Sequence, residues 1–298
     1  MKLRLRQRIG GPPMNYRHAY HAGNFADVMK HAVLARIVEY LKRKDKAFRV
    51  IDTHAGTGMY DLSSEEAQKT GEWRGGIGTL LNAQLPGDAA ALLKPYLDAV
   101  RAANPDGAVT RYPGSPAIAR HLLRRQDRLT AIELHPADAA ALKRHFAGDF
   151  QTRVIELDGW LALGAHLPPK EKRGLVLVDP PFEERDEFGR IVEGLKKAWR
   201  RWPGGIYALW YPIKERKAVE AFRRELAGAG IPKMLELALE IRAPSAEPRF
   251  DGSGMIVVNP PYPLEAEAKT LLPALATTLG ETEATASVRW LAGEAVPR

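Results

Sequence analysis

Apolar runs of strand character alternate with segments of helical periodicity along most of this chain. Such alternation predicts a mostly parallel sheet with helices on both of its faces. The chain is expected to form strands at Phe48 to Thr53, Leu129 to Glu133, Arg153 to Leu157, Leu175 to Val178 and Ile206 to Trp210, and helices at Pro136 to Phe146 and Glu187 to Trp199. A further helix, capped by Asn24, is expected to run to about Lys44.

The last third of the chain is expected to complete the sheet. Met234 to Ile241 and Met255 to Val258 are predicted to pair through a loop that contains Pro and Gly, and Ser287 to Leu291 adds a short strand. The segment from about Leu62 to Tyr112 is rich in Ala and Leu and is much longer than one crossover helix. We therefore predict an α/β domain with a small helical insertion at about residues 62–112.

The N-terminus differs from the rest of the chain in charge. Lys2, Arg4, Arg6 and Arg8 lie in the first thirteen residues with no acid among them, and this segment ends in Gly-Gly-Pro-Pro. We expect residues 1–13 to form a basic flexible arm and residues 14–298 to form the domain, with Met14 as a candidate start. The net charge of +8 and the pI near 9.6 favour a polyanionic partner such as nucleic acid.

Composition narrows the class of protein further. A hydrophobic content of 45% and a charged content of 27% are typical of a soluble globular protein, and no apolar run is long enough to span a membrane. The chain has no cysteine, which excludes disulfides and thiolate metal sites and favours the cytoplasm. The eight histidines show no paired metal-ligand spacing, so we predict no metal.

The turn Asp179-Pro180-Pro181-Phe182, directly after an apolar run, is the most informative motif. Ligands of doubly wound folds bind outside the carboxyl ends of such strands. The prolines stiffen the turn, so an amino group would donate one hydrogen to the Asp179 carboxylate and one to the Pro180 carbonyl. Its lone pair would then turn from a conjugated ring toward an electrophile, while Phe182 stacks on the ring. Taken alone, the same residues also fit a strand followed by a structural Pro-rich turn.

Three other predicted strand ends carry polar groups. Asp52 to Gly58 is a Gly-rich turn, Glu133 can accept from both hydroxyls of a ribose, and Asp158-Gly159 can accept from the amine of an adenine. The first turn lacks the G-x-G-x-x-G of dinucleotide sites, because His54 stands where its first glycine would be. A cofactor with ribose and adenine but no phosphate fits this set, and S-adenosylmethionine is the obvious candidate.

Several segments resemble the bacterial 23S rRNA adenine-N6 methyltransferases of the RlmJ family. The resemblance rests on Asn15 to His31 (NYRHAYHAGNFADVMKH), Asp52 to Gly56, Tyr112 to Pro116, Glu133 to Pro136, Asp158-Gly159, Asp179 to Phe182, Ile206 to Pro212 and Ser253 to Pro261. It implies a class I, Rossmann-like methyltransferase that is monomeric and methylates one adenosine of 23S rRNA free of ribosomal proteins. Phe182 stands where the family commonly has Tyr, which retains stacking and loses a hydroxyl.

The resemblance also implies roles for individual residues. It assigns cofactor contacts to His31, His54, Ser115, Glu133, Asp158, Gly159 and Asp179, makes Asp179 the catalytic acceptor, and places Tyr16, Pro180 and Phe182 at the substrate. From the residues alone, a satisfied core histidine on a helix face is the favoured interpretation of His31.

Three other functions remain open at this stage. The turn Asn259-Pro260-Pro261-Tyr262 resembles the signature of protein glutamine methyltransferases. Asn259 ends the closing strand of a hairpin-like pair, which in this fold runs antiparallel to the others. We therefore expect Asn259 to lie at the opposite edge of the sheet from the cofactor and to have a structural role. The second alternative is methylation of DNA adenine at Asp179. The third is an RNA-binding module without activity, which the four polar strand ends disfavour.

Overall fold

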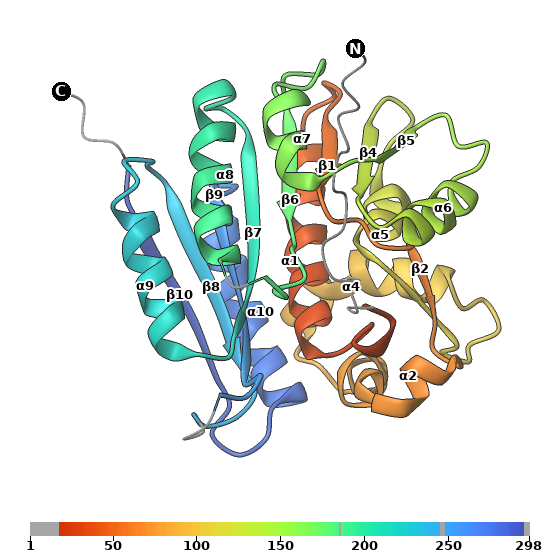
Figure 1. Ribbon diagram of the computed structural model, residues 1–298. Helices are drawn as coiled ribbons and strands as arrows, with labels where there is room; N and C mark the ends of the chain where they lie inside the picture. The colour runs from red at the N-terminus through yellow and green to blue at the C-terminus, as the bar shows by residue number, and fades with distance from the viewer. Residues whose placement is uncertain (1–17, 185, 245–247, 295–298) are drawn as a thin grey trace, which may run out of the picture.

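The computed structural model describes residues 18–184, 186–244 and 248–294. Within these residues eight strands form one sheet in the order β10-β8-β9-β7-β6-β1-β4-β5 (Figure 1). These strands are β1 (Arg49–Asp52), β4 (Arg128–Glu133), β5 (Thr152–Glu156), β6 (Gly174–Val178), β7 (Ile206–Ile213), β8 (Met234–Glu240), β9 (Gly252–Val258) and β10 (Thr285–Ala292). The α/β class and the strand positions predicted from the sequence are thereby confirmed.

The strand directions place the ligand crevice. Strands β5, β4, β1, β6 and β7 are parallel, whereas β9 is antiparallel to both β7 and β8, and β10 is antiparallel to β8. The chain runs outward from β1 through β4 to β5, and then returns to β6 on the other side of β1. The strand order therefore reverses between β1 and β6. Open α/β sheets bind their ligands at such a reversal, outside the carboxyl ends of the strands.

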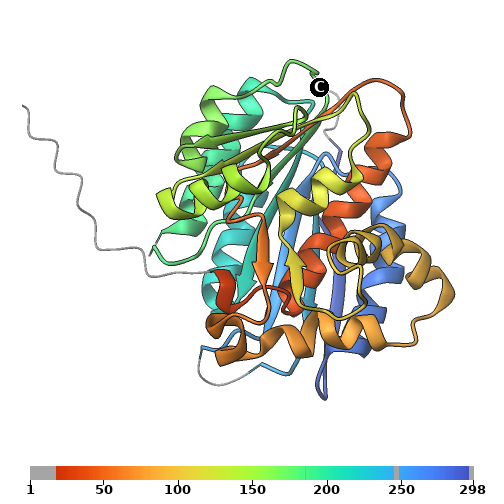
Figure 2. The same ribbon diagram turned by 90° about the vertical axis from the view of Figure 1, so that its right-hand side faces the viewer.

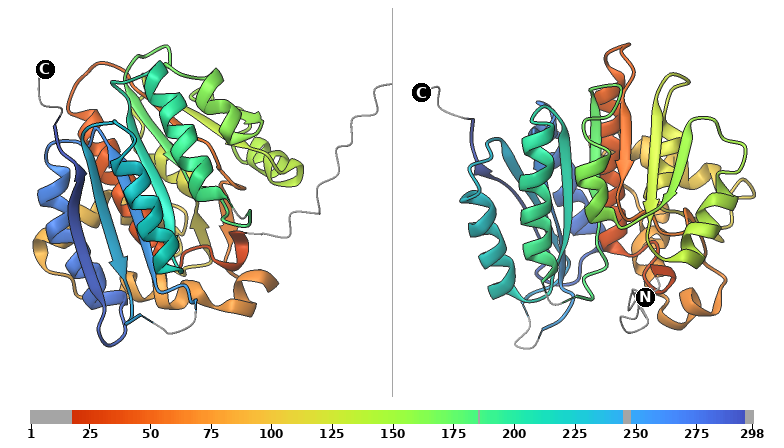
Figure 3. Two further views of the ribbon diagram at one scale, coloured as in Figure 1. Left: turned by 60° about the vertical axis from the view of Figure 1, so that its left-hand side comes forward. Right: turned by 45° about the horizontal axis from the view of Figure 1, so that its top comes forward.

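Two layers of helices cover the sheet. One face packs against α1 (Phe25–Lys42), α5 (Ser115–Leu122), α6 (Pro136–His145) and α10 (Leu264–Leu279), and α4 (Gly87–Ala102) packs on α1, α5 and α10. The other face packs against α7 (Gly159–Ala165), α8 (Glu187–Arg201) and α9 (Arg216–Ala227), which lie along the strands in Figures 1 and 3. The sequence pattern did not single out α5, α7, α9 or α10, since α5 and α7 are short and α10 contains Pro273.

Short elements occupy the segment that was expected to be a helical insertion. After β2 (Met59–Asp61) come α2 (Glu65–Thr70), the π-helical turn η2 (Arg74–Gly78), α3 (Thr79–Asn82) and α4, and then β3 (Arg111–Pro113). Strands β2 and β3 pair antiparallel, a second sheet that the sequence did not predict (Figure 2). A 3-10 turn, η1 (His18–Tyr20), precedes α1. The predicted arm, residues 1–13, and Tyr16 lie outside the described residues.

Local contacts explain where α1 begins and ends. The Asn24 side chain accepts hydrogen bonds from the backbone N–H groups of Ala26 and Asp27, each at 3.0 Å, which confirms the predicted cap. The helix ends at Lys42, two residues before the expected end. The Arg124 guanidinium donates to the carbonyls of Lys42 and Lys44, and so provides a partner for carbonyl groups that have none within the helix.

The second Pro-Pro turn lies at the far edge of the sheet, as predicted from the antiparallel direction of β9. The amide nitrogen of Asn259 donates to the carbonyls of Pro203 and Gly205, both at 2.8 Å, directly before β7 begins. Its backbone has a left-handed φ of 52°, which Asn tolerates better than most residues. The Asn259 amide is thus used in joining β9 to the start of β7.

Candidate active site

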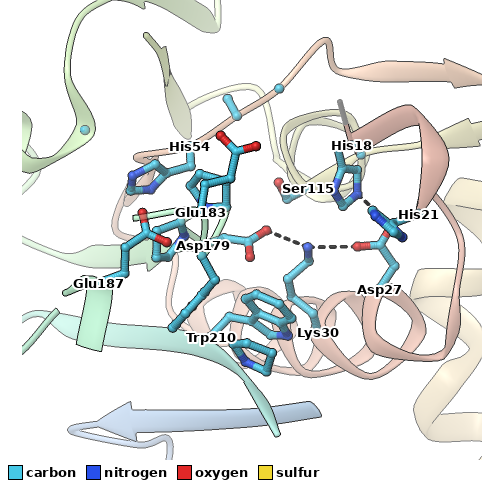
Figure 4. Close-up of a pocket in the computed structure, with 18 of the residues that line it drawn as sticks. His18, His21, Asp27, Lys30, His54, Ser115, Asp179, Glu183, Glu187 and Trp210 are labelled. Carbon is cyan, nitrogen blue, oxygen red and sulfur yellow. Dashed lines mark hydrogen bonds and ion pairs between the residues drawn. The ribbon is translucent and has the colours of Figure 1, made fainter. Parts of the chain in front are cut away.

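A cavity of about 420 Å³ lies at the carboxyl ends of β1, β4, β5 and β6 and is closed on one side by the first half of α1 (Figure 4). Every candidate residue that lies among the described residues lines it: His31, His54, Ser115, Glu133, Asp158, Gly159, Asp179, Pro180 and Phe182. These residues come from segments up to 151 positions apart in the chain. The parallel sheet brings them together because its strand ends share one edge.

Asp179 is held by a buried lysine that the sequence analysis did not consider. The Lys30 ammonium lies 2.5 Å from Oδ2 of Asp179 and 2.8 Å from Oδ1 of Asp27 (Figure 4). Burial would lower the pKa of Lys30, but the two carboxylates outweigh that effect and raise this pKa above its ordinary value. Lys30 therefore stays charged and fixes one oxygen of Asp179, while the carboxylate as a whole still lines the cavity.

The Pro-Pro turn is held in shape by aromatic packing. Phe182 has a left-handed φ of 55°, and its ring meets the rings of Phe188 and Trp210 edge-on at 5.0 and 5.7 Å between centroids. The backbone N–H of Phe182 donates to Glu187, a buried residue of α8. Burial raises the pKa of Glu187 to about 7. The ring of Phe182 is thus positioned beside Asp179 by residues of α8 and β7.

Two carboxylates face the cavity from the ends of β4 and β5. The two oxygens of Glu133 accept hydrogen bonds from the backbone N–H groups of Gly56 and His135, each at 2.8 Å. Burial raises the pKa of Glu133. Asp158 caps α7 through the N–H of Trp160, also at 2.8 Å. A carboxylate oxygen with one such bond retains a lone pair for a ligand donor such as a hydroxyl or an amine.

Gly159 and His54 bring the ends of β1 and β5 close together. A Cβ atom on Gly159 would lie 2.2 Å from the carbonyl oxygen of Thr53, so a larger residue would push the two turns apart. Nδ1 of His54 lies 2.9 Å from the Thr53 hydroxyl, and its ring packs edge-on against Trp160. Burial lowers the pKa of His54 to about 3, so this imidazole is neutral at pH 7.

His31 and Ser115 line the cavity beneath these turns. His31 is buried on α1, and its Nδ1 lies 2.6 Å from the Tyr112 hydroxyl. Burial lowers the pKa of His31 to about 3. Its Nε2 has no hydrogen-bond partner within the described part of the chain. Ser115 is the first residue of α5, whose first-turn N–H groups have no partners within the helix.

The donor and acceptor set fits S-adenosylmethionine. Glu133 and Asp158 offer acceptors suited to a ribose diol and an adenine amine, and the unpartnered Nε2 of His31 is a buried polar atom that a ligand can satisfy. Among the described residues no group of three or more His, Cys, Asp or Glu could hold a metal ion. No described helix is long and apolar enough to cross a membrane.

The sequence analysis missed Lys30, Asp27, Glu187 and Trp210, all of which line the cavity. Lys30 and Asp27 lie one helical turn apart on α1, inside the segment that carries the family resemblance, so their spacing was an available signal. Trp210 lies in the strand Ile206–Ile213, and its indole N–H donates to the Ser253 hydroxyl at 2.9 Å. No pattern in the sequence indicated a site role for Glu187, because acidic residues are common in the first turn of a helix.

A sheet of this order, with the polar strand ends around one cavity, defines the chain as a class I, S-adenosylmethionine-dependent methyltransferase. The family model described as "Ribosomal RNA large subunit methyltransferase D, RlmJ" matches residues 45–292. The chain is 43% identical over 284 residues to "Ribosomal RNA large subunit methyltransferase J" of Escherichia coli and 42% identical to the protein of that name from Haemophilus influenzae. Each match covers 94% of this chain and 100% of the relative. The chain therefore belongs to the RlmJ family of ribosomal RNA methyltransferases.

A solved structure agrees with this assignment. A crystal structure of a Legionella pneumophila protein is 34% identical to this chain, with a TM-score of 0.83, and the match covers 90% of this chain and 98% of that one. The family expected from the sequence, the class I fold and S-adenosylmethionine as cofactor are confirmed. The roles of the individual site residues remain predictions.

Replacing Glu133 by Ala should weaken binding of S-adenosylhomocysteine, the demethylated cofactor, by about 1 to 3 kcal/mol, because a ribose hydroxyl loses a charged acceptor. Isothermal titration calorimetry measures this difference. Glu156→Ala is the matched control, since Glu156 pairs in register with Glu133 on β5 but forms a surface ion pair with Lys143. Equal affinity of Glu133→Ala and the unmodified protein would remove Glu133 from the cofactor site.

Proposed function

We propose that this protein transfers a methyl group from S-adenosylmethionine to N6 of an adenosine in 23S rRNA. The observation that supports adenine N6 is the turn after β6, where Asp179, Pro180 and Phe182 line one cavity. Together they supply two acceptors and a flat face, which suits an amino group on a planar base. Membership of the RlmJ family supports ribosomal RNA as the substrate.

In the proposed mechanism, S-adenosylmethionine supplies a methyl group on a positively charged sulfur. Lys30 holds Oδ2 of Asp179, which orients Oδ1 toward one N–H of the adenine amine. The Pro180 carbonyl accepts the second N–H, and Phe182 stacks on the ring. These contacts turn the nitrogen lone pair away from the ring, and the proton that the amine gives up after transfer passes to Oδ1 of Asp179.

The competing functions are less well supported. For methylation of a protein glutamine, the relevant turn would be Asn259 to Tyr262, but the Asn259 amide already donates to two backbone carbonyls at the edge of the sheet opposite the cavity. Methylation of DNA adenine would use the same Asp179 chemistry, and the family membership favours RNA over it. An RNA-binding module without activity has no need of a carboxylate held by a buried lysine.

Two finer proposals rest on the family resemblance, and a third, the location in the cytoplasm, rests on the absence of cysteine. We propose that the substrate is 23S rRNA free of ribosomal proteins, that the enzyme acts as a monomer, and that it acts in the cytoplasm. The net charge of +8 is compatible with a phosphate-rich substrate.

Mass spectrometry of the product tests the proposed reaction. A 23S rRNA transcript would be incubated with the protein and S-adenosylmethionine that carries a deuterated methyl group, and then digested to nucleosides. We expect about one labelled N6-methyladenosine per transcript. A DNA duplex and a glutamine-containing peptide, treated in parallel, represent the competing functions. Label in another nucleoside, or only in the DNA or the peptide, would refute the proposal.

A further inference from the structure

A buried chain of hydrogen bonds connects His31 to the inserted segment. Nδ1 of His31 lies 2.6 Å from the Tyr112 hydroxyl on β3, and this hydroxyl lies 3.0 Å from that of Tyr96 on α4. Both tyrosines are fully buried and His31 is 1% exposed. Burial raises the pKa of both phenols, so each hydroxyl keeps its hydrogen. The three side chains therefore share three hydrogens, because the neutral imidazole carries one.

The number of acceptors fixes where these hydrogens lie. Tyr112 is the hydrogen-bond partner recorded for the Tyr96 hydroxyl in the described part of the chain. If Tyr96 donates to Tyr112, and Tyr112 donates to Nδ1 of His31, both hydroxyl hydrogens have acceptors. If instead His31 donates through Nδ1, one buried hydroxyl hydrogen is left without an acceptor, which is the costlier arrangement. The imidazole hydrogen then lies on Nε2, a buried atom without a partner in the described part of the chain, on a residue that lines the cavity.

We propose that Tyr112 is a positioning residue that holds His31 with an N–H at Nε2, and that this N–H donates to the carboxylate of the amino-acid part of S-adenosylmethionine. The proposal concerns cofactor binding and does not depend on which nucleotide of the RNA is methylated. Tyr96 completes the chain by donating to Tyr112. Residues of the inserted segment would thereby set the direction of a hydrogen bond in the cofactor site.

The chemistry of the cavity favours the carboxylate as the partner of Nε2. The ribose hydroxyls and the adenine amine are donors that suit the acceptors Glu133 and Asp158, whereas a carboxylate needs N–H or O–H donors. Ser115, three residues after Tyr112, lines the same cavity and begins α5. The N-terminus of that helix also favours negative charge. His31 and the start of α5 therefore both offer donors to the same cavity.

Calorimetry with two cofactor analogues tests the proposal. Tyr112→Phe should weaken binding of S-adenosylhomocysteine about fivefold to tenfold, because His31 loses the partner that orients its ring. Binding of decarboxylated S-adenosylhomocysteine, which keeps the amine, should change less than about twofold. Tyr96→Phe is the matched control: it removes a buried hydroxyl from the same chain but leaves Tyr112 free to donate to His31. In a His31→Ala background, Tyr112→Phe should have no further effect on affinity.

Nitrogen NMR of the unmodified protein provides a second readout that does not require a variant to fold. With 15N-labelled histidine, His31 should show a protonated Nε2 and an unprotonated Nδ1. A protonated Nδ1 would overturn the proposal. In the calorimetric test, a folded Tyr112→Phe that loses affinity equally for both analogues, or for neither, would also overturn it. Failure of the unmodified protein to bind S-adenosylhomocysteine would refute the cofactor site itself. Binding without RNA methylation would refute only the proposed reaction.

Discussion

Asp179→Ala should lower the single-turnover rate of methyl transfer to a 23S rRNA fragment by about 100-fold to 10,000-fold, the range observed for positioned proton acceptors. The variant removes the proposed acceptor for the amine and leaves Pro180 as its one proposed partner. It should still fold, because Lys30 keeps its ion pair with Asp27 at 2.8 Å. Rapid-quench kinetics measures the rate, and circular dichroism checks the fold.

Asn259→Ala is the matched control in the second Pro-Pro turn. It removes two hydrogen bonds to backbone carbonyls, so the free energy of unfolding should fall by about 1 to 3 kcal/mol. The rate of methyl transfer by the folded protein should stay close to that of the unmodified enzyme, because Asn259 lies at the other edge of the sheet. A folded but inactive Asn259→Ala beside an active Asp179→Ala would move the active site to the second turn.

Lys30→Met should have the largest combined effect on stability and activity. It removes the buried cation between Asp27 and Asp179, whose side chains are 2% and 12% exposed. Removing one partner of a buried ion pair costs about 3 to 5 kcal/mol of stability, because the remaining charge is left without compensation. Methyl transfer should also fall by about 100-fold or more, since Asp179 is no longer held in one orientation.

Chemical denaturation and single-turnover kinetics measure the two effects of Lys30→Met. Lys42→Met is the control on the same helix, where Lys42 forms a partly exposed pair with Glu39 that should contribute at most about 1 kcal/mol. Lys30→Arg keeps the charge, but its planar guanidinium does not fit a site built for a compact ammonium, so it should restore stability better than activity. A stable and active Lys30→Met would show that Asp179 needs no buried cation.

The sequence alone determined the class of fold and the strand ends that carry chemistry. Apolar runs such as Gly174 to Val178 predict buried parallel strands, because both faces of such strands are covered by helices. Glu133, Asp158 and Asp179 follow such runs directly, so their common location at one edge of the sheet followed from topology. The antiparallel direction of β9, and with it the remote position of Asn259, was predicted from the hairpin-like pair that closes this class of fold, and it is confirmed.

Only the tertiary structure decided which side chains complete the site. Lys30 contacts Asp179 across 149 positions of sequence, and His31 contacts Tyr112 across 81. Local periodicity places Lys30 and His31 on a helix but does not say which face of that helix meets the sheet edge. From periodicity alone, His31 could therefore be a core histidine. The pairing of β2 with β3 was equally hidden, because 49 residues separate the two strands. Such contacts depend on how distant elements pack, whereas the strands and their ends depend on patterns within a few residues.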